Sequence, residues 1–357
     1  VNTGEKRGPM PAKRVQVAES FDDVYKWALE QTCSDGLPIV PPTSDRVAAF
    51  LDTVDLKPES VIAELPPRRS ACTVEQLAAN AVMAGCLPEY FPVVVAALEA
   101  LAAPAFELYG INTTTNPTAP MVIVNGPIRH ELKINGSYST LGPGFRANAT
   151  IGRAVSLAMM NMAGRVPGEV CKSTHKFPGA YTMCVGELEE KSPWAPLHVE
   201  RGFKKEDNTV TVWSPTGTTN MVDIDSMTAD DIILGFRAAA IGAGSTNVFP
   251  FYSQGETGFM FSPPHADVLA QKFTKEQVKQ YFVDNLKIPV DWLPKIRTDT
   301  MLSRENGQIE NGYVRFLARA EQVAIVVAGG PGGYPSVHLP MFGNSYIQTR
   351  LIKRKKK

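Results

Sequence analysis

The sequence is poor in cysteine and contains no CxxC pair. The 357 residues include five cysteines, and this odd number gives no basis for a disulfide framework. Their spacing does not fit a zinc ribbon either. These absences exclude a small disulfide-stabilised scaffold and favour a reducing compartment. We therefore expect a cytoplasmic protein.

No apolar stretch is long enough to cross a membrane. The longest one, residues 92–106, is interrupted by Glu99 and Pro104 and falls short of the roughly 20 residues that a membrane helix needs. The first residues also lack the apolar segment of a secretory signal. We expect neither a membrane helix nor a membrane partner.

Several common catalytic signatures are missing as well. The sequence contains no GxSxG, no HExxH, no GxxxxGK[ST] and no EF-hand pattern. This excludes the usual serine-hydrolase, zinc-protease, P-loop and calcium-loop interpretations.

The sequence has 36 basic and 36 acidic residues, so its formal net charge is zero. The two kinds of residue are, however, unevenly distributed along the chain. The last eight residues carry six basic groups, and the first fourteen carry four against Glu5 alone. Residues 15–349 then hold 26 basic and 35 acidic groups, a formal charge of −9. An acidic body makes nucleic-acid binding an unfavoured interpretation. The basic ends are typical of solvated tails, although contact with an acidic partner stays an alternative.

Hydrophobic periodicity predicts a flexible basic N-terminus over residues 1–19 and a mostly helical region over residues 20–105. Ser20 is placed to cap a first helix, and Ser44 to open a second. Thr73 and Gln76 form a capping box before a third helix, and Pro92 suits the first turn of a fourth.

The pattern changes near residue 106, where short apolar runs alternate with helical periods. We predict an α/β or α+β core over residues 106–349, with a mixed sheet and Gly-rich loops at the strand ends, followed by a basic tail over residues 350–357. Strands are expected in the following segments: 119–127, 180–187, 208–213, 247–251, 257–262 and 322–330. Helices are expected in these: 151–164, 228–240, 264–273 and 274–288. No internal repeat is visible in the sequence.

A first candidate binding segment is LGPGFRANATIGR, residues 141–153. Glycines 142 and 144 permit close backbone approach, and a helix is expected to begin shortly after them, where free N–H groups attract anions. Arg146 and Arg153 add guanidinium groups for a carboxylate or phosphate, and Asn148 adds a neutral donor. A purely structural glycine turn is the competing interpretation.

A second candidate is His265, which follows an apolar run and two prolines at the expected start of a helix. A helix N-terminus lowers the pKa of an imidazole, so His265 would be neutral and able to act as a base or metal ligand. A histidine that merely caps the helix is equally compatible with the pattern.

A third candidate is the polar segment 171–203, which concentrates His175, Glu187 and His198 among its cysteines and glutamates. Histidines and carboxylates perform acid–base catalysis and bind zinc or iron, although the spacing of these two histidines matches no known ligand pattern. The cofactor is open at this stage, with a divalent transition metal as one alternative. A turn-rich surface with solvated charges is the other.

Two Gly-rich segments follow or precede apolar runs, IGAGSTN with Ser245 and GGPGG with Gly330 and Gly332. If such loops gather at one end of a sheet, they form a pocket. Cys86, at an expected helix–loop junction, is a candidate nucleophile, with a buried structural thiol as the alternative.

Seven segments resemble a known family: DGLPIVPPT (35–43), AELPPRR (63–69), NAVMAGCLPEYFPVV (80–94), VIVNGPIR (122–129), LGPGFRANATIGRA (141–154), SPWAPLHVERGF (192–203) and VVAGGPGG (326–333). They are similar to a bacterial family associated with UGSC-type (seleno)proteins, and the resemblance spans most of the chain, from about residue 20 to 345. The sequence has no Cys-Gly-Ser-Cys string, so the resemblance implies that a thiol or selenol would come from a partner chain. It assigns no catalytic residue.

These observations lead to an expected enzyme, or subunit of a catalytic complex, that acts on a small anionic molecule. The reaction would be metal-assisted hydrolysis or hydration, or cleavage of a carbon–heteroatom bond, with His and Glu as acid–base groups. The alternative is a non-catalytic binding or scaffold subunit of a redox complex. Either one is expected to form a homo- or hetero-oligomer.

Overall fold

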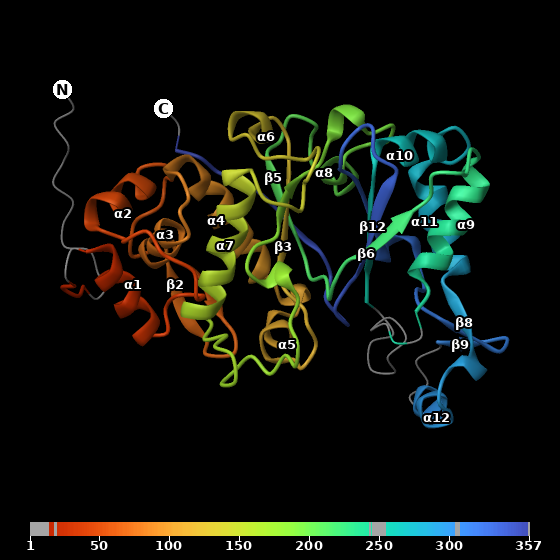
Figure 1. The fold of residues 1–357 in the computed structure, drawn as a ribbon, viewed down its shortest axis with the longest axis horizontal. Coiled ribbons are helices and arrows are strands. Elements are labelled where there is room, and N and C mark those ends of the chain that lie inside the picture. The colour runs from red at the N-terminus through yellow and green to blue at the C-terminus, as the bar shows by residue number, and fades with distance from the viewer. Residues whose placement is uncertain (1–13, 18–19, 243, 245–254, 304–307, 356–357) are drawn as a thin grey trace.

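Two four-stranded sheets pack face to face at the centre of the protein, and helices cover the outer face of each (Figure 1). The computed structural model of the chain describes residues 14–17, 20–242, 244, 255–303 and 308–355. The order of layers is helix, sheet, sheet, helix. This arrangement belongs to the predicted α+β class, with helices at the N-terminal end of the chain.

The N-terminal region is mostly helical, as predicted. Its elements are α1 Phe21–Glu30, α2 Ser44–Leu51, β1 Val61–Leu65, β2 Ser70–Thr73, α3 Val74–Met83, α4 Phe91–Leu101 and α5 Leu108–Thr113. The Ser20 side chain accepts a hydrogen bond from the N–H of Asp23, and Thr73 and Gln76 form both halves of the capping box. Pro92 lies in the first turn of α4.

The first sheet has the order β13-β5-β3-β4. Its strands are β3 Met121–Asn125, β4 Cys184–Gly186, β5 Thr209–Trp213 and β13 Gln348–Leu351. Between them lie α6 Ile128–Glu131, α7 Arg146–Asn161 and α8 Leu197–Glu200. Strands β3 and β4 are parallel, because α7 carries the chain back between them, and β5 and β13 follow in antiparallel order.

The second sheet has the order β11-β7-β12-β6. Its strands are β6 Thr219–Val222, β7 Thr257–Phe261, β11 Val323–Val327 and β12 Pro335–Pro340, with α9 Ala229–Ala240, α10 Pro263–Ala270 and α11 Lys275–Asn285. A small outlying sheet consists of β8 Lys287–Pro289, β9 Ile309–Glu310 and β10 Tyr313–Arg315, next to α12 Lys295–Ser303. As in the first sheet, one parallel pair is followed by two antiparallel strands.

The chain crosses between the two sheets twice. After β5 it enters the second sheet as β6, and after β12 it returns to the first as β13. Where the crossings pass, Phe342 N–H donates to the carbonyl of Ser214, and Thr216 N–H donates to that of Pro340, both at 2.8 Å. The two sheets therefore share a topology and exchange their last strands, although no repeat is visible in the sequence.

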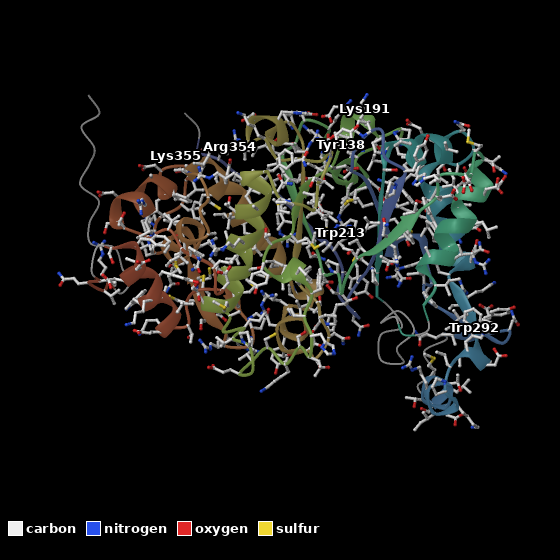
Figure 2. All side chains as sticks on the ribbon, in the orientation of Figure 1. Tyr138, Lys191, Trp213, Trp292, Arg354 and Lys355 are labelled. Atoms are coloured by element: carbon white, nitrogen blue, oxygen red, sulfur yellow. The ribbon has the colours of Figure 1, made fainter. Side chains whose placement is uncertain are left out.

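Alternation along the strands separates three hydrophobic clusters. Val122 and Val124 of β3 face the N-terminal helices, whereas Met121 and Ile123 face the second sheet. Trp213, fully buried, lies between the sheets at the centre of the protein (Figure 2). On the far side, phenylalanines 259 and 261 of β7 pack against the helices that cover the second sheet.

The helical region and the first sheet share one hydrophobic core. Side chains of α2, α3 and α4 belong to the same cluster as those of β3 and β5. The change of pattern near residue 106 therefore lies inside one packed body.

The basic C-terminal segment is docked through residue 355. Arg350 belongs to β13, Arg354 pairs with Glu131 at 2.6 Å, and Lys355 N–H donates to the carbonyl of Thr53. The N-terminal residues 1–13, like the predicted strand 247–251, lie outside the described residues. Within the described ranges, no helix combines the length and the apolar character needed to cross a membrane.

Candidate active site at the ends of the parallel strands

The carboxyl ends of both parallel strand pairs meet at one end of the two sheets. Leu188 N–H, after β4, donates to the carbonyl of Val327 at the end of β11, and Gly329 N–H donates to that of Gly136, both at 2.8 Å. Side chains that follow parallel strands at such an end commonly form ligand sites in α/β proteins.

A fully buried polar cluster lies where β3 and β4 end. The amide of Asn125, the last residue of β3, donates to Glu187 at 2.6 Å and to Glu189 at 3.0 Å. The carboxyl group of Glu187 also accepts a hydrogen bond from the Leu197 N–H at the start of α8, at 2.9 Å. Thr209, opposite Asn125 in β5, and His198, next to Leu197, complete the cluster. We call these four residues, Asn125, Glu187, His198 and Thr209, the strand-end cluster.

Each member of the strand-end cluster has one polar atom without a hydrogen-bond partner. These atoms are Asn125 Oδ1, Glu187 Oε1, His198 Nδ1 and Thr209 Oγ1, and all four side chains are completely buried. A buried polar atom without a partner costs roughly 1–3 kcal/mol. Ordered water or a small polar ligand can supply the missing partners of such atoms.

Burial shifts the ionisation of Glu187 and of the nearby Lys275. Burial raises the pKa of its carboxyl group above the ordinary value, while Lys275 and the hydrogen bonds from Asn125 and Leu197 act in the opposite direction. Burial also lowers the pKa of Lys275, and Glu187 opposes that change. A carboxyl group and an amine whose pKa values shift toward neutrality are typical of proton-transfer sites.

A charged rim connects this cluster to the surface. Arg129, itself buried, pairs with Glu189 at 3.0 Å and with Glu190 at 2.8 Å, and it donates to the carbonyl of Glu187. Glu190 also contacts the exposed His130 at 2.6 Å. Burial opposes ionisation of Glu190, but the hydrogen bonds from Arg129 and His130 prevail and lower its pKa to about 2. A carboxyl group of raised pKa, Glu187, thus lies behind one of lowered pKa, Glu190.

Two loops close over the same end of the sheets. The exposed Tyr138, at the top of the view in Figure 2, lies against Gly330, where any side chain would overlap its ring. Gly332 lies beneath the Tyr138 hydroxyl. The GGPGG loop therefore contacts the segment between α6 and α7.

His265 lies near this end but uses both ring nitrogens within the protein. Nδ1 contacts Ser336 Oγ at 2.8 Å, and Nε2 contacts the carbonyl of Asp223 at 2.9 Å. Burial lowers its pKa, with Asp223 acting against the change. In the neutral ring, Nε2–H donates to Asp223 and Nδ1 accepts from Ser336. His265 thereby ties α10 to β6 and β12.

The basic side chains of the predicted anion loop are occupied by the protein itself. Arg146 donates twice to the carbonyl of Gly85 at 3.1 Å, and Arg153 forms two 2.8 Å contacts with Asp35. Asn148 binds both backbone groups of Asn135 and the carbonyl of Cys184. Helix α7 begins at Arg146, and the loop holding Gly142 and Gly144 is exposed. The segment fastens neighbouring loops: Arg153 is paired with Asp35, whereas Arg146 is exposed and contacts one backbone carbonyl.

The remaining predicted residues lie apart from the strand-end cluster. Cys86 is buried, its thiol donates to the carbonyl of Thr150, and burial raises its pKa to about 12, which suits a structural thiol. His175 is exposed on the loop before β4, whereas His198 is buried after it. Ser245 lies outside the described residues.

A pocket of about 280 Å³ lies at the opposite end of the sheets. Gly242 and Gly244 line it together with Thr216, Thr219 and His338. His338 contacts Thr257, the first residue of β7, at 2.8 Å, so Gly242 and Gly244 lie at the opposite end of the sheets from the GGPGG loop. Within the part of the chain that the structure describes, no three His, Cys, Asp or Glu residues gather to hold a metal ion.

Sequence reasoning singled out Glu187 and His198 but missed Asn125, Thr209 and Lys275. Asn125 carried a usable signal, since it is the polar residue that ends an apolar strand. Thr209 and Lys275 gave none, because only the sheet pairing and the packing of α8 bring them near Glu187.

Comparison of the chain with protein-family models, with curated proteins and with solved structures finds no match.

Proposed function

We propose that the chain is an enzyme, or the catalytic subunit of one, in which Glu187 transfers a proton to or from a small polar molecule. The observation that carries this proposal is the strand-end cluster, in which a buried carboxyl group of raised pKa keeps one oxygen unpartnered. Purely structural buried carboxyl groups normally have all their hydrogen bonds satisfied.

The contacts of Glu187 suit a proton-transferring group. Asn125 and the Leu197 N–H both bind Oε2, so they hold the carboxyl group in place and leave Oε1 for a substrate or water. A pKa raised toward neutrality lets the same group donate a proton and take one back. Hydrolysis, hydration and carbon–heteroatom bond cleavage all require such a step.

The substrate class follows from the surroundings. The unpartnered polar atoms of the strand-end cluster suit a small anionic or strongly polar molecule better than an apolar one. The two cations near Glu187 already have acidic partners, since Lys275 pairs with Glu200 and Arg129 pairs with Glu189 and Glu190. The resemblance to the UGSC-associated family supports a partner chain that supplies a thiol or selenol. In that case, the enzyme would be a hetero-oligomer.

A first experiment tests the protonation state without knowledge of the substrate. The infrared C=O band of a neutral carboxylic acid is recorded at pH 7 for the wild type, for Glu187→Gln and for the surface control Glu131→Gln. Glu256, whose pKa burial raises to about 7, contributes to this band as well, so we expect Glu187→Gln to remove only one component of it and Glu131→Gln to leave it unchanged. If Glu187→Gln leaves the spectrum unchanged, Glu187 is ionised and the proposal fails.

A second experiment tests catalysis. A panel of small carboxylates, amides and thioethers is incubated with the protein, alone and with thiol reductants, and product formation is followed by NMR. Glu187→Gln should reduce turnover at least about 100-fold, as loss of a general acid or base does. Turnover that survives in folded Glu187→Gln would contradict the assigned role. The absence of turnover over the whole panel would favour the scaffold alternative.

A further inference from the structure

Two buried cations lie together on the loop that joins α7 to β4. Arg165 is 7% exposed, and its Nη1 atom has no hydrogen-bond partner. The Nζ atom of Lys176 is also buried and has no oxygen or nitrogen partner, and the Cys171 thiol lies near it. Both residues precede β4, whereas the strand-end cluster follows it, so the two features lie at opposite ends of that strand.

The two cations lie close enough to repel each other. Burial and the neighbouring Arg165 together lower the pKa of Lys176 to about 8, while Cys171 acts against the change. Burial likewise lowers the pKa of Arg165 to about 10, again with Cys171 opposing. The only polar neighbour that offsets these charges among the described residues is therefore a thiol.

This arrangement differs from the other buried arginines of the protein. Arg129 pairs with Glu189 and Glu190, and Arg153 with Asp35. By contrast, no carboxylate of the described chain forms an ion pair with Arg165 or with Lys176. Buried charges without a partner cost several kcal/mol, so proteins pair them or use them to bind an ion of opposite charge.

We propose that Arg165 and Lys176 form a binding site for a small oxyanion, namely a carboxylate, a phosphate or a sulfate. A guanidinium group binds two oxygens of such an anion in one plane, and the ammonium group adds a point charge from a second direction. The site is separate from the strand-end cluster, and it supplies the anion recognition that the sequence suggested for Arg146 and Arg153.

Binding is tested with inorganic phosphate, sodium sulfate and sodium acetate at constant ionic strength, by calorimetry and by thermal unfolding. The variants are Arg165→Met and Lys176→Met. The matched control is Lys172→Met, an exposed lysine of the same loop that only donates to the carbonyl of Gly168.

We expect at least one anion to bind saturably to the wild type and to Lys172→Met, and at least tenfold more weakly to Arg165→Met and Lys176→Met. In anion-free buffer the two variants should unfold at the same or a higher temperature than the wild type, because each removes an unpaired buried charge. If Arg165→Met fails to fold, the anion affinity of Lys176→Met, compared with that of Lys172→Met, tests the proposal alone.

Affinity that is equal in Lys176→Met and Lys172→Met would overturn the proposal, and so would a lack of saturable binding by all three anions. Glu187→Gln should bind the anion as the wild type does. This separates failure of the anion site from failure of the proposed catalysis.

Discussion

The amide of Asn125 donates a 2.6 Å hydrogen bond to the carboxyl group of Glu187, and this contact joins the ends of two parallel strands inside the protein. Because both side chains are completely buried, neither can exchange its partner for solvent. The pair is therefore sensitive to any change of charge.

Replacement Asn125→Asp should place a second carboxyl group against Glu187. Two buried carboxyl groups cannot both ionise at this distance, so we expect destabilisation by about 2 kcal/mol that is larger at pH 8 than at pH 5. Chemical denaturation at the two pH values measures this effect. The swapped double variant Asn125→Asp/Glu187→Gln should recover most of the loss, and a failure to recover it would show that the pair is not coupled.

Glu256 should make the protein less stable as the pH rises. Burial raises its pKa to about 7, with the Ile347 N–H and two arginines opposing, whereas in the unfolded chain it titrates near 4.5. The folded state binds the proton more tightly, so its stabilising effect is complete below pH 4.5 and is lost as the pH rises to 7. The loss is on the order of 3 kcal/mol. Glu256→Gln should flatten this pH dependence, while the exposed Glu276→Gln should leave it unchanged.

Gly330→Ala should disturb the loop over the strand ends with little effect on global stability. A methyl group there overlaps the Tyr138 ring, but Tyr138 is exposed and free to move outward. We expect the hydrogen-exchange protection of the GGPGG loop, and any turnover by the protein, to fall. Adding Tyr138→Ala to Gly330→Ala should then change nothing further, and independent, additive effects would argue against this contact.

The five cysteines should differ sharply in reactivity. Cys33 is partly exposed, whereas burial raises the pKa of Cys72 and Cys86 to about 12 and that of Cys184 still further. A thiol reagent applied to the native protein at pH 8, followed by peptide mapping, should label Cys33 well before these three. Rapid native labelling of Cys86 would contradict its structural role.

Gly258→Ala should be among the most damaging single substitutions in the protein. A methyl group at this position overlaps the indole ring of Trp213, which is completely buried between the sheets and cannot move aside. Overpacking of this kind costs about 1–3 kcal/mol. Thermal unfolding measures it, and Gly217→Ala, where nothing lies within 4 Å, serves as the control.

The sequence predicted the elements that carry a strong local signal. Strands β3, β5, β7 and β11 are continuous apolar runs, and the helices of the N-terminal region have recognisable caps. It missed β12, which has proline at both ends, and β13, which has the polar sequence QTRL, because their sheet positions come from partners far along the chain. The hydrogen bonds of Arg146 and Arg153 could not be predicted for the same reason, since the carbonyls and the carboxylate that accept them come from residues 35–38 and 85.

The double crossing of the chain also determines how the protein must fold. Strand β5 pairs with β13, whose Thr349 meets Thr211 across 138 residues, and β12 closes the second sheet against β6. Neither sheet acquires its full set of backbone partners until the other half of the chain is present. Such nonlocal pairing slows folding and couples the two halves of the chain. A destabilising substitution in either half should therefore make both sheets unfold together in one cooperative transition.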